Sequence, residues 1–286
     1  MAEHALIFPN GRGENLVGVF HEPLQTPRAA IVMLHGWSGT RCGPHQMLTR
    51  AARLFCEQNY AILRFDFAGR GDSDGDTELA TLATMQGDAR AAFRWMRAQT
   101  EAPMLVLGLC SGCEIAVASV EDSLGGAILW SAPVFAALPS DERAAKKRGD
   151  NLKKYARKLL NPATYAKILR GQIDTQAVFK AMAGGGGAAS KNLESNQPGQ
   201  LPRGFRSAAL DKWRAFEAPR LQIYGGADPI TPEALAWYRD NSGLAADVDL
   251  IEGANHSFYG LDWEHQVFER TLEWLEKWHK ERKGDG

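Results

Sequence analysis

The sequence predicts an α/β fold in which a mostly parallel sheet carries helices on both of its faces. Short apolar runs with the composition of buried strands recur along the chain, and helical patterns separate several of them. Such alternation is typical of parallel strands joined by crossover helices. The six runs span residues 30–34, 61–67, 104–107, 126–130, 221–224 and 248–251.

The size and charge of the chain favour one large domain that acts on a small, diffusing substrate. Its 286 residues suffice for an ample core, and 33 basic residues against 34 acidic ones give a net charge of −1. No global field therefore favours nucleic acid or an anionic membrane. The first five residues do not resemble a secretory leader and no apolar run could span a bilayer, so we expect a cytoplasmic protein without membrane insertion.

The other elements follow from local patterning. Residues 4–8 and 15–21 flank a Gly11-Arg12-Gly13 turn, which predicts a hairpin that adds antiparallel strands at one sheet edge. The helical candidates share apolar residues at helical spacing, and we interpret the apolar stripe of the last one as packing on the sheet. These candidates span residues 46–57, 85–98, 110–120, 232–240 and 263–280.

A long segment without strand patterns separates residue 133 from residue 221, and it exceeds the length of an ordinary connection. We therefore predict an α/β core formed by residues 1–133 and 216–286. An inserted helical lid is predicted over residues 134–215.

The composition of the predicted lid changes along its length. Residues 141–170 carry ten Lys or Arg against three acids, which suits either the attraction of an anionic substrate or a solvated helix face. Residues 183–200 are rich in Gly and polar residues and lack the Lys-Ser/Thr pair of a phosphate-binding loop. We therefore predict that this second part is a flexible linker.

The segment from Leu105 to Cys113 has the pattern of a tight turn between a buried strand and a helix. Such a turn requires small residues two positions before and two positions after a nucleophile, because its backbone is strained and crowded. Gly108 and Gly112 hold these positions around Cys110. No glycines frame Ser111 in this way, so the spacing favours Cys110 as the nucleophile. The Ser111 amide is then predicted to be an oxyanion donor.

Four cysteines in a chain of this length do not suggest a disulfide framework. Cys110 and Cys113 form a C-x-x-C pattern, which leaves a redox pair or a metal site as an alternative. The chain has no second such pair, and the redox motif is typical of shorter, thioredoxin-like proteins. We therefore predict neither a metal nor a cofactor.

A nucleophile for acyl transfer needs a base and a group that orients this base. The run at 221–224 leads into Asp228, and the run at 248–251 leads into a loop that contains His256. An isolated Asp is usually a helix cap, and an isolated His is usually a surface residue. Because each residue follows an apolar strand in the order nucleophile, acid, histidine, we predict a triad of Cys110, His256 and Asp228.

Two further loops are predicted to shape this site. The run at 30–34 ends in a turn with the sequence His35-Gly36-Trp37-Ser38-Gly39, in which the Trp37 N–H is our candidate for the second oxyanion donor, with His35 and Gly36 shaping the turn. The loop at 66–73 is predicted to be structural, with Asp66 or Arg70 bracing its neighbours.

Glu114 lies one helical turn after the predicted nucleophile, so the helix would bring it towards the site. It is either a second ionisable group of the site or an ordinary helix residue with a local partner.

Residues 35–39, 66–73 and 108–112, together with Asp228 and His256, resemble the α/β-hydrolase superfamily over nearly the whole chain. This resemblance implies an eight-stranded, mostly parallel sheet with a cap between strands six and seven. The cysteine nucleophile resembles that of the dienelactone hydrolases. Gly108-Leu109-Cys110 and the basic insertion are similar to bacterial hydrolases that accompany exosortase systems.

The sequence therefore predicts a hydrolase that cleaves an activated ester, lactone or thioester through an acyl-cysteine intermediate. A thiolate competes as a leaving group when the tetrahedral adduct collapses, so unactivated amides should be poor substrates. An acyltransferase with the same triad is the alternative within enzymes. A ligand-binding homologue without catalysis is the alternative from another class.

Overall fold

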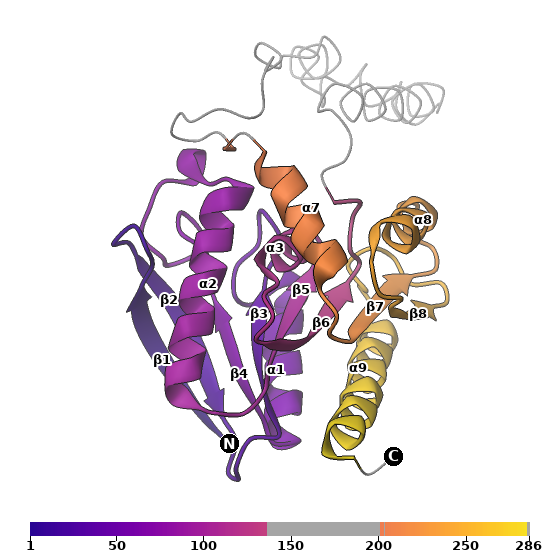
Figure 1. Ribbon diagram of the computed structural model, residues 1–286. Helices are drawn as coiled ribbons and strands as arrows, with labels where there is room; N and C mark the ends of the chain where they lie inside the picture. The colour runs from indigo at the N-terminus through magenta and orange to yellow at the C-terminus, as the bar shows by residue number, and fades with distance from the viewer. Residues whose placement is uncertain (136–200, 203, 285–286) are drawn as a thin grey trace, which may run out of the picture. The chain divides into compact units, whose positions relative to one another are not determined.

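An eight-stranded sheet runs through the part of the chain that the computed structural model describes, which comprises residues 1–135, 201–202 and 204–284. Its strand order is β1-β2-β4-β3-β5-β6-β7-β8 (Figure 1). β1 and β2 form an antiparallel hairpin and β2 pairs antiparallel with β4, whereas the other pairs are parallel. The predicted fold class is thereby confirmed. The strands are β1 (Ala2–Pro9), β2 (Asn15–Glu22), β3 (Ala29–Leu34), β4 (Tyr60–Phe65), β5 (Met104–Leu109), β6 (Leu124–Trp130), β7 (Arg220–Gly225) and β8 (Asp247–Ile251).

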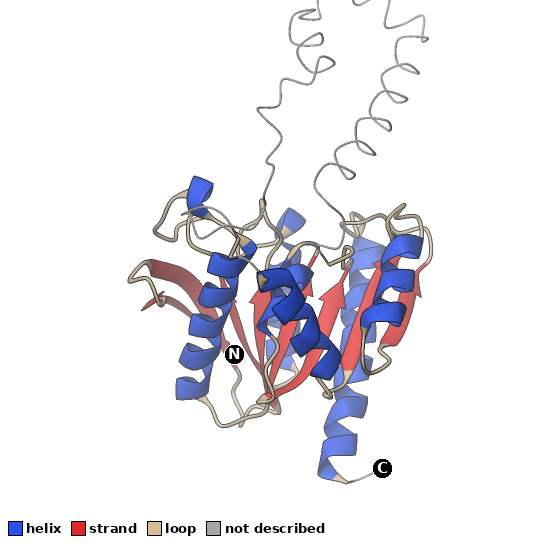
Figure 2. Cartoon of the chain, turned by 45° about the horizontal axis from the view of Figure 1, so that its top comes forward, coloured by secondary structure: helices blue, strands red, loops and turns tan. Residues whose placement is uncertain are grey.

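Helices cover both faces of this sheet (Figure 2). α1 and α9 pack together on one face, while α2, α3 and α7 contact one another in series on the opposite face. The helices are α1 (Met47–Glu57), α2 (Leu82–Gln99), α3 (Gly112–Ser119), α7 (Phe205–Ala215), α8 (Thr231–Asn241) and α9 (Leu261–Lys283), with short 3-10 turns at Pro44–Gln46 and Thr77–Leu79. No helix among them is long and apolar enough to cross a membrane.

The predicted helix at 110–120 begins two residues later than expected. Cys110 has a φ of 55°, in the left-handed region, so regular helix starts only at Gly112. Most of the predicted lid, including the basic stretch at 141–170 and the linker at 183–200, lies outside the described residues. α7, at the end of the range 134–215, is described and packs against α3.

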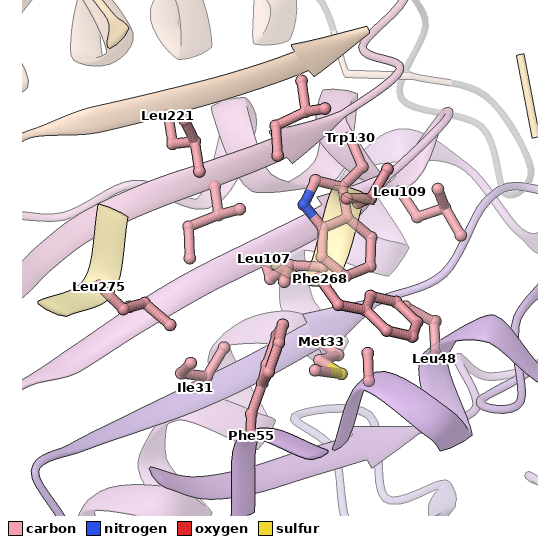
Figure 3. Close-up of a cluster of buried hydrophobic side chains, with 14 of the residues drawn as sticks. Ile31, Met33, Leu48, Phe55, Leu107, Leu109, Trp130, Leu221, Phe268 and Leu275 are labelled. Atoms are coloured by element: carbon pink, nitrogen blue, oxygen red, sulfur yellow. The ribbon is translucent and has the colours of Figure 1, made fainter. Parts of the chain in front are cut away.

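An apolar core fills the space between the sheet and the α1–α9 pair (Figure 3). Trp130, at the end of β6, lies at its centre, with ring centroids 6.3 Å from Phe55 and 5.9 Å from Phe268. Its indole N–H donates to the Thr271 hydroxyl at 3.1 Å, so the buried polar atom is satisfied. Burial of each such aromatic side chain contributes about 1.5–3 kcal/mol. This packing fixes the end of the strand beside β5.

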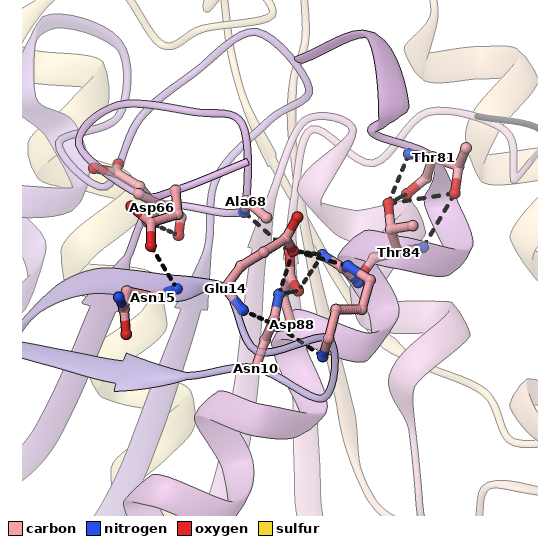
Figure 4. A network of polar contacts seen from close by, with 11 residues as sticks. Asn10, Glu14, Asn15, Asp66, Ala68, Thr81, Thr84 and Asp88 are labelled. Atoms are coloured by element: carbon pink, nitrogen blue, oxygen red, sulfur yellow. Dashed lines mark hydrogen bonds and ion pairs between the residues drawn. The ribbon is translucent and has the colours of Figure 1, made fainter. Parts of the chain in front are cut away.

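A second buried cluster joins the β1–β2 hairpin to α2 through a carboxylate (Figure 4). Asp88 is fully buried and accepts hydrogen bonds from the Asn10 amide at 2.8 Å and the Ala68 backbone N–H at 3.0 Å. Arg12 donates to the same carboxylate at 2.9 Å. Burial raises the pKa of Asp88, and these donors oppose that rise. The loop after β4 is thus tied to the hairpin and to α2.

The chain reverses its direction of travel across the sheet at β3. β4 lies on one side of β3 and β5 lies on the other, so the connections from the carboxyl ends of β3 and β5 diverge. In open parallel sheets, such a point leaves a crevice where ligands bind. The loop that starts at His35 and the turn at Cys110 both lie at this crevice.

Candidate active site

The turn between β5 and α3 holds Cys110 in a strained conformation at the start of the helix. A left-handed φ costs a non-glycine residue roughly 1–3 kcal/mol and persists only where the surroundings enforce it. A Cβ atom at Gly108 would lie 2.7 Å from the Cys113 backbone N, and one at Gly112 would overlap with the Leu34 carbonyl. The Cys110 N–H donates to the Trp130 carbonyl at 2.9 Å. Both glycines are therefore required for α3 to approach β5 and β3.

The structure brings Cys110, His256 and Asp228 into one hydrogen-bonded line. The His256 Nε2 lies 3.0 Å from the Cys110 Sγ, and the Nδ1 of the same ring lies 2.6 Å from the Asp228 Oδ2. Because a carboxylate only accepts, Nδ1 carries a proton and Nε2 faces the sulfur. The Asp228 side chain is 2% exposed and that of His256 is 33% exposed, so the line runs from the interior to an accessible thiol.

The electrostatics of this line favour a thiolate–imidazolium pair. Burial alone would raise the pKa of Cys110, but hydrogen bonds and charge from His256, together with hydrogen bonds from Ser111, lower it below its ordinary value. The hydrogen bond to Cys110 is the largest influence on His256, and with Asp228 it overcomes desolvation and raises the pKa of His256 to about 9. The ion pair is thus favoured over the neutral thiol and imidazole.

Two neighbouring loops dock closely so that Asp228 and His256 can meet. The Ala227 N–H donates to the Ala254 carbonyl at 2.9 Å, and a Cβ at Gly225 would lie 2.5 Å from that carbonyl oxygen. The Asn255 side chain accepts from the N–H groups of Ser257 and Tyr259, both at 3.1 Å. Asn255 is not among the predicted site residues, although asparagine favours turns because its side chain can accept from the backbone N–H two residues on.

The two predicted oxyanion donors lie next to each other, but one of them already has a partner. The Trp37 N–H donates to the Ser111 hydroxyl at 2.6 Å. A Cβ at Gly36 would lie 3.4 Å from that hydroxyl and 3.5 Å from the Cys110 Cβ, so this turn packs against Cys110. The hydroxyl lies where it can hydrogen-bond both the thiolate and the amide, and a bound carbonyl oxygen would have to displace it from Trp37.

His35 and Arg70 both stabilise the turn at Trp37. His35 is fully buried, its Nδ1 donates to the Gly36 carbonyl at 2.8 Å, and its Nε2 accepts from the Phe67 N–H at 3.3 Å. Burial lowers the pKa of His35, which keeps the ring neutral in this role. The Arg70 Nε donates to the Trp37 carbonyl at 2.7 Å, and its guanidinium lies 5.4 Å from the centre of the Trp37 ring.

The loop at 66–73 has the bracing role predicted for it. Asp66 is fully buried and accepts from the backbone N–H of Arg41 at 2.5 Å and from the N–H of Asp72 at 3.1 Å. The Arg41 guanidinium pairs with both carboxylates. This pairing joins the loop after β4 to the loop after β3, from which the oxyanion turn is built.

A cavity of about 430 Å³ opens at the thiol. Residues 35–40 form one of its walls, Leu109–Ser111 form its floor, and His256 and Ser257 close another side. Glu114 is half-buried in the first turn of α3 and is not among the lining residues. The described residues contain no group of three or more His, Cys, Asp or Glu side chains that could hold a metal ion.

Cys113 differs from Cys110 although it lies one helical turn away. It is fully buried, and its thiol donates to the carbonyls of Gly108 at 3.1 Å and Trp130 at 3.4 Å. Burial raises the pKa of Cys113 well above the ordinary value. A buried thiol of this kind is unreactive, so the geometry favours the use of Cys110 alone over a redox pair.

Comparison with known proteins identifies the family. The sequence model described as the alpha/beta hydrolase family matches residues 31–270. The chain belongs to this family. Among solved structures, the alpha/beta hydrolase resembles the esterase domain of a Rhodothermus marinus protein, with a TM-score of 0.62, 21% identity and coverage of 97% of this chain and 99% of the other. It also resembles the Pyrococcus furiosus esterase Pf2001, with a TM-score of 0.64, 16% identity and coverage of 97% and 91%.

A more local likeness links this alpha/beta hydrolase to curated vertebrate proteins. It is 29% identical over 113 residues to the lysophosphatidylserine lipase ABHD12 of Xenopus tropicalis. The matched part is 39% of this chain and 28% of that protein, so the chain spans well under half of the length of its curated relative.

Proposed function

We propose that this alpha/beta hydrolase cleaves an activated carboxylic ester, lactone or thioester through a covalent acyl-Cys110 intermediate. The observation that carries the proposal is the line from Asp228 through His256 to Cys110, with contacts of 2.6 Å and 3.0 Å, at the mouth of a cavity. A receptor that only bound a ligand would need neither a low-pKa thiol nor an oriented imidazole. The esterase and lipase names of the similar proteins support a substrate with an ester bond.

Acylation begins from the thiolate–imidazolium pair. The Cys110 sulfur forms a bond to the acyl carbon, and the carbonyl electrons move onto oxygen. The Ser111 amide stabilises this oxygen, as does the Trp37 amide once the oxygen has displaced the Ser111 hydroxyl from it. As the adduct collapses, the bond to the leaving group breaks and His256 Nε2–H gives its proton to the departing atom. The product of this half-reaction is a thioester on Cys110.

Deacylation reverses the role of the histidine. His256 is now neutral and takes a proton from water while the oxygen attacks the thioester carbon. The carbon–sulfur bond breaks, the carboxylic acid leaves, and the proton on His256 restores the ion pair with the thiolate. Asp228 keeps Nδ1 protonated throughout, so that Nε2 always faces the reaction.

The experiment is a search for the acyl-enzyme by intact mass after incubation with a panel of activated acyl esters and thioesters. We expect the mass of one acyl group on Cys110 and a loss of turnover of at least about 10³-fold in Cys110→Ala. Cys42→Ala is the matched control, because Cys42 is also a partly exposed free thiol but does not line the cavity.

Two results would overturn the proposal. One is a Cys110→Ala protein that turns over a substrate of the wild type at the wild-type rate. The other is hydrolysis of simple amides as fast as that of thioesters with the same acyl group, since a thiolate is expelled more readily than an unactivated amine.

A further inference from the structure

A second cavity of about 530 Å³, wide open to solvent, adjoins the first at His256. It shares Pro44, His256 and Ser257 with the first cavity, but Cys110 and the Trp37 turn line only the first. The remaining walls are His45, Asn255 and Tyr259. His256 therefore lies between a cavity that holds the nucleophile and a cavity that does not.

The wall at His45 is held rigidly. The His45 Nε2–H donates to the Ser257 carbonyl at 3.1 Å, and the opposite ring nitrogen accepts from the Arg50 Nη2 at 3.1 Å. Arg50 donates to both oxygens of the Glu264 carboxylate at 2.5 Å. His45 and Gln46 have φ values of 38° and 64°, so the turn is strained where it faces the cavity. Strain that neighbouring contacts maintain at a cavity wall is typical of functional sites.

The exposed part of the wall is aromatic, and the charged groups behind it are paired. The rings of His45 and Tyr259 meet edge to face with centroids 5.2 Å apart, and Tyr259 remains 70% exposed. The Asn255 side-chain oxygen is occupied by backbone N–H groups, and Arg50 neutralises Glu264 behind the His45 ring. An uncharged planar group fits such a surface better than an anion does.

The positions of the oxyanion donors and of His256 suggest a role for the second cavity. The carbonyl oxygen of the adduct must face the amides of Trp37 and Ser111, which lie in the first cavity. The departing atom must face the Nε2–H of His256. His256 also lines the second cavity. We propose that the second cavity is the leaving-group subsite, that it takes an uncharged aromatic alcohol or thiol, and that Tyr259 determines this preference.

This inference rests on the proposed function and makes a separate prediction. The leaving group has departed once acyl-Cys110 has formed, so Tyr259 acts on acylation and not on deacylation. An aromatic contact is worth about 0.5–1.5 kcal/mol, which corresponds to a roughly threefold to tenfold preference. The preference should disappear when the ring is removed.

The test compares S-benzyl and S-cyclohexylmethyl acetyl thioesters, which have leaving groups of similar size and differ in aromaticity. In Tyr259→Leu we expect the ratio of the two kcat/KM values to fall about threefold to tenfold towards one, whereas Tyr259→Phe retains it. The hydrolysis rate of preformed acetyl-Cys110, followed by intact mass, should agree within about twofold between Tyr259→Leu and the wild type. Leu261→Ala is the control, since Leu261 is 78% exposed and lines neither cavity.

The outcomes separate this inference from the proposed function. If Cys110→Ala hydrolyses both thioesters at the wild-type rate, the proposed function is overturned and the subsite with it. If the adduct forms but Tyr259→Leu affects both thioesters equally, or slows hydrolysis of the preformed adduct, only the subsite is overturned.

Discussion

Asp88 and Asp228 are both buried carboxylates beside the sheet, yet their surroundings differ in one respect. Asp88 receives donors from Asn10, Arg12 and the Ala68 backbone, all of which belong to loops and elements that it ties together. Asp228 accepts from the Ile230 N–H at 3.2 Å and gives its other oxygen to His256, whose far nitrogen faces a thiol. The hydrogen-bond partners of Asp88 all belong to the scaffold, whereas those of Asp228 lead through His256 to a thiol in a cavity. Under the proposed function Asp88 therefore serves stability and Asp228 serves chemistry, because only the hydrogen-bonded line of Asp228 ends at an accessible thiol.

The sharpest test of this comparison is Asp228→Asn. The amide retains the size of the carboxylate and can still accept from Ile230, but it no longer favours the charged His256 and permits the wrong tautomer. We expect kcat to fall about 10³-fold. The free energy of unfolding, measured in urea, should change by less than about 1 kcal/mol. A variant that loses stability and retains activity would contradict the catalytic role proposed for Asp228.

The counterpart is Asp88→Ala, for which we expect the opposite pattern. Removal of the carboxylate leaves the Ala68 N–H without its acceptor in a buried site and removes one of the two acceptors of the Asn10 amide, which keeps Glu14. The free energy of unfolding should decrease by about 2–4 kcal/mol, as a urea titration would measure. Activity per folded molecule should remain at the wild-type level, and a large selective loss of kcat would contradict the structural role.

The pH dependence of kcat/KM tests the proposed roles of Cys110 and His256. The lowered pKa of Cys110 and the raised pKa of His256, about 9, leave both groups charged between these values. Activity should therefore rise as the thiol deprotonates and decrease about tenfold per pH unit above pH 9, where His256 loses the proton that the leaving group needs. A rate that keeps rising through this range would show that imidazolium is not required for acylation.

The smallest predicted effect is that of Ser111→Ala. The hydroxyl lowers the pKa of Cys110 through a hydrogen bond, so its loss should raise this pKa and slow alkylation of the thiol by iodoacetamide about threefold at mildly acidic pH. At alkaline pH the two proteins should react at equal rates. Ser38→Ala is the control, because Ser38 also lines the cavity. An equal slowing at every pH would instead indicate altered access to the thiol.

Much of the fold could be predicted from the sequence because strands and helices follow short-range patterns. The predicted strands and helices are present in the described chain, with shifted ends where a local conformation intervenes. α2 begins at Leu82 instead of 85 because Thr81 and Thr84 form a capping box. α3 begins late because Cys110 adopts a left-handed conformation. The spacing of Gly108 and Gly112 predicts a strained turn there, but the predicted helix boundary does not take that strain into account.

The candidate site was predictable as far as it depends on strand ends. Cys110, Asp228 and His256 each follow an apolar run, and parallel strands bring their carboxyl ends to one edge. The contact between the Trp37 amide and the Ser111 hydroxyl could not be predicted, since it depends on a side-chain rotamer. The position of His45 depends on Glu264 in α9, more than two hundred residues away along the chain.

The glycines around Cys110 restrict which positions of this turn can vary over evolution. Gly108 and Gly112 each lie against backbone atoms, so any larger residue there would separate α3 from the sheet. The side chain at position 110 faces the cavity and meets no such barrier. A serine could therefore replace Cys110 without a change of fold. The scaffold fixes where the side chain at position 110 is placed and leaves its reactive atom, oxygen or sulfur, open to selection.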